Sequence, residues 1–104
     1  MSFVVQLSPT AEADLERLFD FLLERAETTE DLDNAQAAID TIRAITQRQL
    51  AVTPFSFRKA AQNPMQRELI IPFGRTGYVA LYEVIGTSKV VVLAVRHQRQ
   101  EDYH

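Results

Sequence analysis

The chain has 104 residues, of which 46% are hydrophobic and 24% are charged, a composition typical of one soluble globular domain. No apolar run approaches the roughly 18 residues of a membrane span, and the first residues lack the basic segment of a signal peptide. The absence of cysteine excludes disulfides and cysteine-based zinc sites and suits a reducing cytoplasm. We therefore expect one domain over residues 1–104, located in the cytoplasm, with no cofactor and no membrane contact.

The net charge of −3 is unevenly distributed. Residues 1–52 hold four Arg and ten Asp or Glu, a net of −6, whereas residues 53–104 hold seven Lys or Arg and four Asp or Glu, a net of +3. The acidic total argues against avid non-specific binding to nucleic acid. A surface that faces an anion is therefore expected in the C-terminal half.

The first half predicts a strand followed by two helices. Residues 3–7 read as a strand, and Ser8-Pro9 is typical of a helix start, with Ser8 as the N-cap. The first helix is expected to end near Arg25, and the second to run from about Leu32 to Leu50. Because the connection between them is short, the helices should form an antiparallel hairpin. Their apolar stripes are Ala11, Leu15, Leu18, Phe19, Leu22 and Ala26, and then Ala35, Ala38, Ile39, Ile42 and Ile45.

The second half changes to the period of strands. Residues 51–66 appear irregular, and strands are predicted over 67–71, 78–85 and 89–95, with a turn over 72–77 that contains Gly74 and Gly77. The last of these strands does not alternate, so both of its faces are expected to be covered. The order β-α-α-β-β-β predicts an α+β fold, in which a largely antiparallel sheet carries the helical hairpin on one face.

Candidate functional residues follow the last apolar strand. Arg96, His97, Arg99 and Tyr103 lie within eight residues. A metal-free ribonuclease needs a proton acceptor, a proton donor and a cation on the phosphate, and His97, Tyr103 and Arg99 are side chains of these types. The alternative is a solvated strand end with Tyr103 packed back on the sheet. No nucleotide-binding or hydrolase motif is present, and with only His97 and His104 a dedicated metal site is not expected.

Three segments carry a family resemblance, namely Arg67-Glu68-Leu69, Gly77-Tyr78-x-x-Leu81-Tyr82-Glu83-Val84 and Val92-Leu93-Ala94-Val95-Arg96-His97-x-Arg99. With the predicted topology, they resemble the ParE/RelE superfamily of type II toxin–antitoxin toxins, which includes ParE-like plasmid stabilisation toxins. The resemblance covers nearly the whole chain. It implies a cytoplasmic bacterial toxin that a cognate antitoxin wraps and silences in a hetero-oligomer.

The superfamily divides by target. Toxins of the ParE type poison DNA gyrase and have no established catalytic residues, whereas those of the RelE type cut mRNA on the ribosome. Val79 stands where RelE-type toxins usually have an arginine, and the acidic charge and long helical hairpin also resemble ParE. A gyrase inhibitor is therefore the leading interpretation. The alternative is a ribosome-dependent mRNA endoribonuclease that uses His97, Arg99 and Tyr103.

Two contact surfaces are expected. The surface for the cellular target consists of the basic and aromatic residues of the C-terminal half, namely Arg58, Arg67, Arg96, His97, Arg99 and Tyr103. The surface for the antitoxin includes Phe21 and Leu23, because both fall off the apolar stripe of the first helix.

Overall fold

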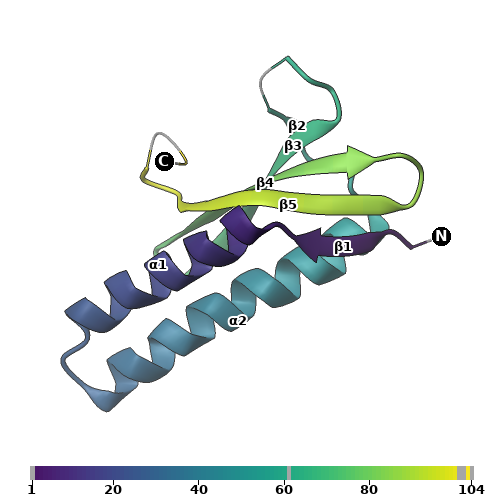
Figure 1. Ribbon diagram of the computed structural model, residues 1–104. Coiled ribbons are helices and arrows are strands. Elements are labelled where there is room, and N and C mark those ends of the chain that lie inside the picture. Colours follow the sequence, from purple (N-terminus) through teal and green to yellow (C-terminus); the bar gives the residue numbers. More distant parts are fainter. Residues whose placement is uncertain (1, 61, 101–102, 104) are drawn as a thin grey trace.

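Five strands form one mixed sheet, and a helical hairpin covers one of its faces (Figure 1). The computed structural model describes residues 2–60, 62–100 and 103. Its elements are β1 (Val4–Leu7), α1 (Pro9–Arg25), α2 (Thr29–Val52), β2 (Arg58–Lys59), β3 (Gln66–Phe73), β4 (Thr76–Ile85) and β5 (Lys89–His97). The strand order is β1-β5-β4-β3-β2, with β1 parallel to β5 and the other pairings antiparallel. The predicted α+β architecture is confirmed.

Helix α1 begins as the sequence predicts. Ser8 has an extended backbone, and its side chain accepts a hydrogen bond from the backbone N–H of Ala11 at 3.0 Å. Pro9 follows at the first helical position, where the lack of an N–H costs nothing. The side chains of Ala11 and Leu15 are buried against the sheet. The cap and the apolar stripe together fix where this helix starts and which face it buries.

Helix α2 starts earlier than expected, at Thr29 rather than near Leu32, and continues to Val52. The reason is a capping box. The Thr28 hydroxyl accepts the Asp31 N–H at 3.0 Å, and the Asp31 carboxylate accepts the Glu27 N–H at 3.0 Å. These bonds convert residues predicted as a loop into the first turn. No helix within the described ranges has the length and apolarity needed to cross a membrane.

The strands of the second half are longer than predicted. Strand β3 extends to Phe73, so that Gly77 lies inside β4 opposite Pro72 rather than in the turn. A Cβ atom on Gly77 would lie 2.3 Å from the Ile71 carbonyl oxygen, so only glycine allows the two strands to approach this closely. The short strand β2, which was expected to be irregular, pairs with Arg67 and Glu68 of β3.

The core lies between the sheet and the hairpin. Tyr78, Ala80, Tyr82 and Val84 alternate along β4 and face the helices, and all four are buried. Strand β5 lies in the interior of the sheet, with β1 on one side and β4 on the other. The expectation that both of its faces are covered is wrong for the outer face, where Val91 and Leu93 remain partly exposed.

Strand β5 loses its partner on the β1 side after Val92, because β1 ends there. Leu93 forms a bulge at this point, since Val92 and Ala94 pair with the adjacent residues Tyr82 and Leu81 of β4. Side chains of α1 and its cap then replace the missing strand. The Ser8 hydroxyl donates to the Leu93 carbonyl at 3.0 Å, and the buried Asp14 carboxylate accepts the Val95 N–H at 2.9 Å.

Replacement of Ser8 by alanine should reduce the free energy of unfolding by about 1–2 kcal/mol, because it removes both the helix cap and the bond to Leu93. Urea denaturation measures this effect. Ser56→Ala, at an exposed loop position, is the control and should change the stability by less than about 0.5 kcal/mol. An unchanged midpoint for Ser8→Ala would show that neither bond matters.

Candidate interaction site

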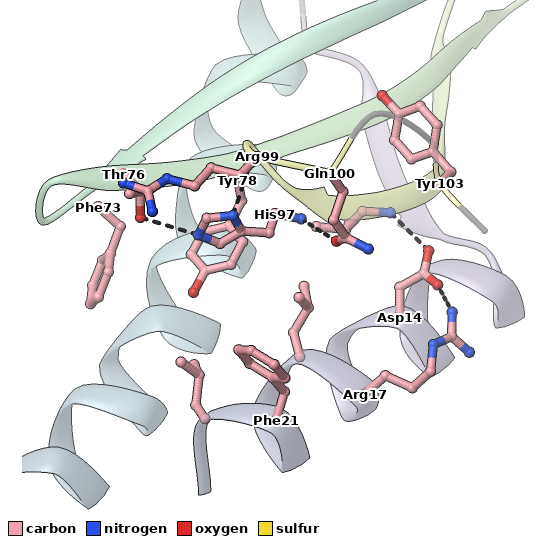
Figure 2. A pocket seen from close by; sticks show the side chains of 13 residues that line it. Asp14, Arg17, Phe21, Phe73, Thr76, Tyr78, His97, Arg99, Gln100 and Tyr103 are labelled. Carbon is pink, nitrogen blue, oxygen red and sulfur yellow. Dashed lines mark hydrogen bonds and ion pairs between the residues drawn. The ribbon is translucent and has the colours of Figure 1, made fainter. Parts of the chain in front are cut away.

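A pocket of about 700 Å³ opens between α1 and the end of the sheet where β5 finishes (Figure 2). Helix α1 forms one wall, and the adjoining ends of β3 and β4 contribute Phe73 and Thr76 to the other. The remaining lining residues are Asp14, Arg17, Leu18, Phe21, Leu22, Tyr78, Val95, His97, Arg99, Gln100 and Tyr103. The walls are therefore largely apolar. Arg17 forms an ion pair with the Asp14 carboxylate, and Arg99 adds positive charge to a protein that is acidic overall.

His97 is held on both ring nitrogens. Its Nδ1 accepts the Arg99 N–H at 3.1 Å, and its Nε2 lies 3.2 Å from the Thr76 hydroxyl. The ring also meets the Tyr78 ring edge-on, with the centroids 5.5 Å apart. Because Nδ1 accepts a hydrogen bond, the imidazole is neutral with its proton on Nε2. Burial, and then the positive charge of Arg99, lower the pKa of His97, which also favours the neutral ring.

Tyr103 is anchored to Glu68 of β3. Its hydroxyl donates to Glu68 Oε2 at 2.5 Å. Burial raises the pKa of Tyr103, and the hydrogen bond to the Glu68 carboxylate raises it further. Glu68 also accepts from Arg58, whose Nη2 lies 2.9 Å from Oε1, and pairs with Arg96 at 3.9 Å. The phenol is thus protonated, and its hydroxyl is directed to Glu68 of β3.

Arg96 supports the segment that follows β5. Its side chain is only 12% exposed. Its Nη1 donates to the carbonyls of His97 at 3.3 Å and of Gln100, and its guanidinium lies 5.1 Å from the centre of the Tyr103 ring. These contacts occupy the side chain within the protein, so Arg96 holds the tail in place.

Arg99 lies at the tip of a closed turn. The His97 N–H donates to the Gln100 side-chain oxygen at 2.8 Å, and the Gln100 N–H donates back to the His97 carbonyl at 3.0 Å. Arg99 is exposed and lines the pocket. The turn thus presents this cation at the mouth of the pocket.

The other sequence-predicted contact residues lie apart from this turn. Arg67 donates to the carbonyls of Phe55 at 3.1 Å and Phe57 at 2.9 Å and so fastens a loop, whereas Arg58 is 56% exposed. On α1, Phe21 is 48% exposed and lines the pocket, and Leu23 is exposed outside it. The structure therefore brings together His97, Arg99, Tyr103 and Phe21 around one pocket and separates Arg58, Arg67 and Leu23 from it.

A metal site is not formed by the parts of the chain that the structure describes, where no three His, Asp or Glu side chains gather suitably. His104 lies outside the described residues.

Comparison with known proteins identifies the family. The model of the ParE toxin of the type II toxin–antitoxin system parDE matches residues 5–102. The chain belongs to the ParE toxin family. It is also 39% identical over 93 residues to toxin RelE3 of Caulobacter vibrioides, which covers 89% of this chain and 91% of that protein. The solved structure of a chromosomal ParDE system from P. aeruginosa has the same fold, with a TM-score of 0.69 at 20% identity over 95% of this chain and 97% of that one.

Sequence reasoning missed Asp14 and Glu68 of this ParE-family chain. Asp14 follows Ala11 by three residues and precedes Leu18 by four, so a carboxylate stands on the apolar side of α1. That position was a signal of a buried partner. Glu68 gave no such signal, because its contacts with Tyr103 and Arg96 cross β4 and join residues far apart in the sequence.

The lowered pKa of His97 predicts a pH dependence of stability. The unfolded chain, with a His pKa near 6.5, takes up a proton before the folded chain does as the pH falls. The free energy of unfolding should therefore decrease as the pH drops through 6.5 toward the lower folded value. His97→Gln should show a smaller decrease between pH 7.5 and 5.5, measured by urea denaturation. An equal decrease in parent and variant, or an NMR titration of His97 above 6.5, would contradict this assignment.

Proposed function

We propose that this ParE-family toxin inhibits DNA gyrase by binding it, and that a cognate antitoxin silences the toxin in the cytoplasm. The family match supports the toxin class and implies an antitoxin partner. The choice of a binding mechanism rests on the chemistry of the pocket.

The supporting observation is that both titratable candidates are engaged in hydrogen bonds within the protein. The Nδ1 of His97 already accepts a backbone N–H, and its Nε2 faces the Thr76 hydroxyl. The Tyr103 hydroxyl donates to Glu68, and its raised pKa makes it a poor base. A base and an acid that act on one phosphate need to converge, whereas these two groups have different partners: His97 contacts Thr76 and the Arg99 N–H, and Tyr103 contacts Glu68.

In this proposal, some residues of the target surface contact the partner directly, and others hold those residues in position. Arg99 at the pocket mouth is the exposed cation that faces a partner, whereas Arg58 is 56% exposed but is paired with Glu68 and has to leave this carboxylate to bind a partner. Arg96, His97 and Tyr103 build the turn that carries Arg99, and Arg67 fastens the loop next to β2. Such fixed cations favour an acidic protein surface or a protein–DNA complex.

A ribosome-dependent endoribonuclease is the second candidate. The relative from Caulobacter vibrioides carries the name toxin RelE3. In addition, Arg58, Arg96 and Tyr103 gather around Glu68 on the outer side of the sheet. Two arginines beside a tyrosine suit a phosphodiester, although Glu68 already occupies the position of an anion there.

The antitoxin in this proposal lays an amphipathic helix along the helical hairpin and an extended segment against the sheet. Phe21 is half-exposed beside the pocket, and the Arg25 guanidinium lies 4.0 Å from the centre of its ring. The pocket walls suit apolar side chains, and Arg25 and Arg99 suit neighbouring carboxylates. The open edge of β5 is already occupied by Ser8 and Asp14, so strand pairing is expected at the outer edge of β1 or β2.

Phe21→Glu should weaken binding of the antitoxin at least about tenfold, because it places a charge where an apolar side chain is buried in the complex. Leu23→Glu should have a smaller effect, since Leu23 lies outside the pocket. Isothermal titration calorimetry with the protein encoded by the adjacent gene measures the affinity. Val52→Glu is the matched control, because Val52 is a 65% exposed apolar residue at the far end of α2. Equal affinities for Phe21→Glu and Val52→Glu would exclude the pocket from the interface.

Mechanism is tested in a gyrase supercoiling assay and in a purified translation system. The parent toxin should inhibit gyrase and leave translation intact. Arg99→Ala should weaken inhibition by a graded factor of about ten, and His97→Gln and Tyr103→Phe should weaken it no further than that, because none of them removes a reacting group. Lys89→Ala, an exposed cation at the other end of β5, is the control.

The ribonuclease predicts a different pattern. Loss of a general acid or base typically costs 100-fold or more in rate. If the parent cleaves ribosome-bound mRNA and the rate falls by this factor in His97→Gln or Tyr103→Phe, the protein is a ribonuclease and the gyrase proposal is wrong.

A further inference from the structure

We propose that Glu68 is the anchor of the C-terminal segment, and that it acts with Arg96 and Tyr103 to position Arg99. The anchor itself depends only on the contacts below. Its consequence for inhibition rests on the proposed contact role of Arg99.

The geometry of Glu68 carries this inference. Glu68 belongs to β3, and β4 separates it from β5, which leads into the tail. Its side chain is 16% exposed and accepts from Tyr103 at 2.5 Å while pairing with Arg96 at 3.9 Å and with Arg58 at 2.9 Å. A carboxylate that is partly shielded from water and holds several donors forms strong hydrogen bonds. Glu68 thereby ties the last described residue of the chain to a strand in the rigid sheet.

Arg96 connects this anchor to the turn. It pairs with Glu68, lies against the Tyr103 ring and donates to the carbonyls of His97 and Gln100. The same guanidinium therefore contacts the anchor and both ends of the turn. If the anchor is lost, Arg96 loses the charge that orients it.

The turn is closed from its other side by His97. The His97 ring accepts the Arg99 N–H, and the His97 backbone bonds twice with Gln100. Arg99 is thus placed between a fixed strand end and the Glu68 anchor. Ordering the backbone before binding reduces the entropy that binding would otherwise cost, so Arg99 acts as a preorganised contact.

Hydrogen exchange in the full chain tests the anchor. Glu68→Gln keeps the size of the side chain and removes its charge, and Tyr103→Phe keeps the ring and removes the hydroxyl. Both variants should accelerate exchange of the Arg99 and Gln100 amides by about tenfold, since each removes a bond to a charged group. The Val95 amide, which bonds to Asp14, should exchange at the parental rate.

Glu83→Gln is the matched control. Glu83 lies on β4, is also partly exposed, and accepts a hydrogen bond from Gln66 at 3.0 Å. It should leave the Arg99 and Gln100 amides unchanged. The double variant Glu68→Gln/Tyr103→Phe should accelerate exchange by less than the product of the single effects, because the two groups act through one bond.

The anchor is overturned if the Arg99 and Gln100 amides exchange at the same rate in Glu68→Gln, in Glu83→Gln and in the parent. Tyr103→Phe repeats this test in a variant that leaves the residues of the sheet unchanged. The gyrase assay is a separate readout. If amide exchange at Arg99 and Gln100 accelerates in Glu68→Gln but gyrase is inhibited as strongly as by the parent, Glu68 is still the anchor, and the contact role of Arg99 is overturned.

Discussion

The rest of the structure depends on one hydrogen bond, from the Val95 N–H to the buried carboxylate of Asp14. A strand in the interior of a sheet needs partners on both sides, and β1 is too short to serve β5 beyond Val92. An unpaired buried N–H would cost roughly 1–3 kcal/mol. Helix α1 removes this cost with a side chain and is thereby fixed against β5. Because Ser8 bonds to Leu93 one residue beyond the end of the pairing, the start of the helix is fixed in the same way.

This arrangement also creates the pocket. Where β1 would have continued, α1 lies instead, and its side chains Leu18, Phe21 and Leu22 face the last part of β5. The adjoining ends of β3 and β4 form the opposite wall through Phe73 and Thr76. At the same time, side chains satisfy the open edge of β5, with Asp14 at Val95 and Gln100 at His97. A protected edge resists pairing with another strand, so the pocket offers a partner its side chains more readily than its backbone.

Local signals in the sequence predicted much of the fold. The Ser8-Pro9 start of α1 and the antiparallel hairpin follow from caps and periodicity, which involve residues close together in the chain. The early start of α2 was also readable, because Thr28 and Asp31 have the spacing of a capping box. Strand β2 and the position of Gly77 inside β4 could not be predicted from the sequence, because both depend on how closely β3 approaches its neighbouring strands. In the candidate site, Tyr103 was predicted but its partner Glu68 was not, since the bond between them joins positions 35 residues apart.

The positive charge of the C-terminal half has a largely structural use. Arg67 holds loop carbonyls, Arg96 holds the tail, and Arg58 shares Glu68 with Arg96. A count of cations therefore overstates the surface available to an anion, because a guanidinium bonded within the protein must give up those bonds before it binds a partner. Arg99 differs, because it contributes its backbone N–H to the turn while its side chain is exposed at the pocket mouth. Because these other arginines are bonded within the protein, recognition of a partner depends mainly on the short turn that carries Arg99. Glu68 of β3 keeps this turn ordered.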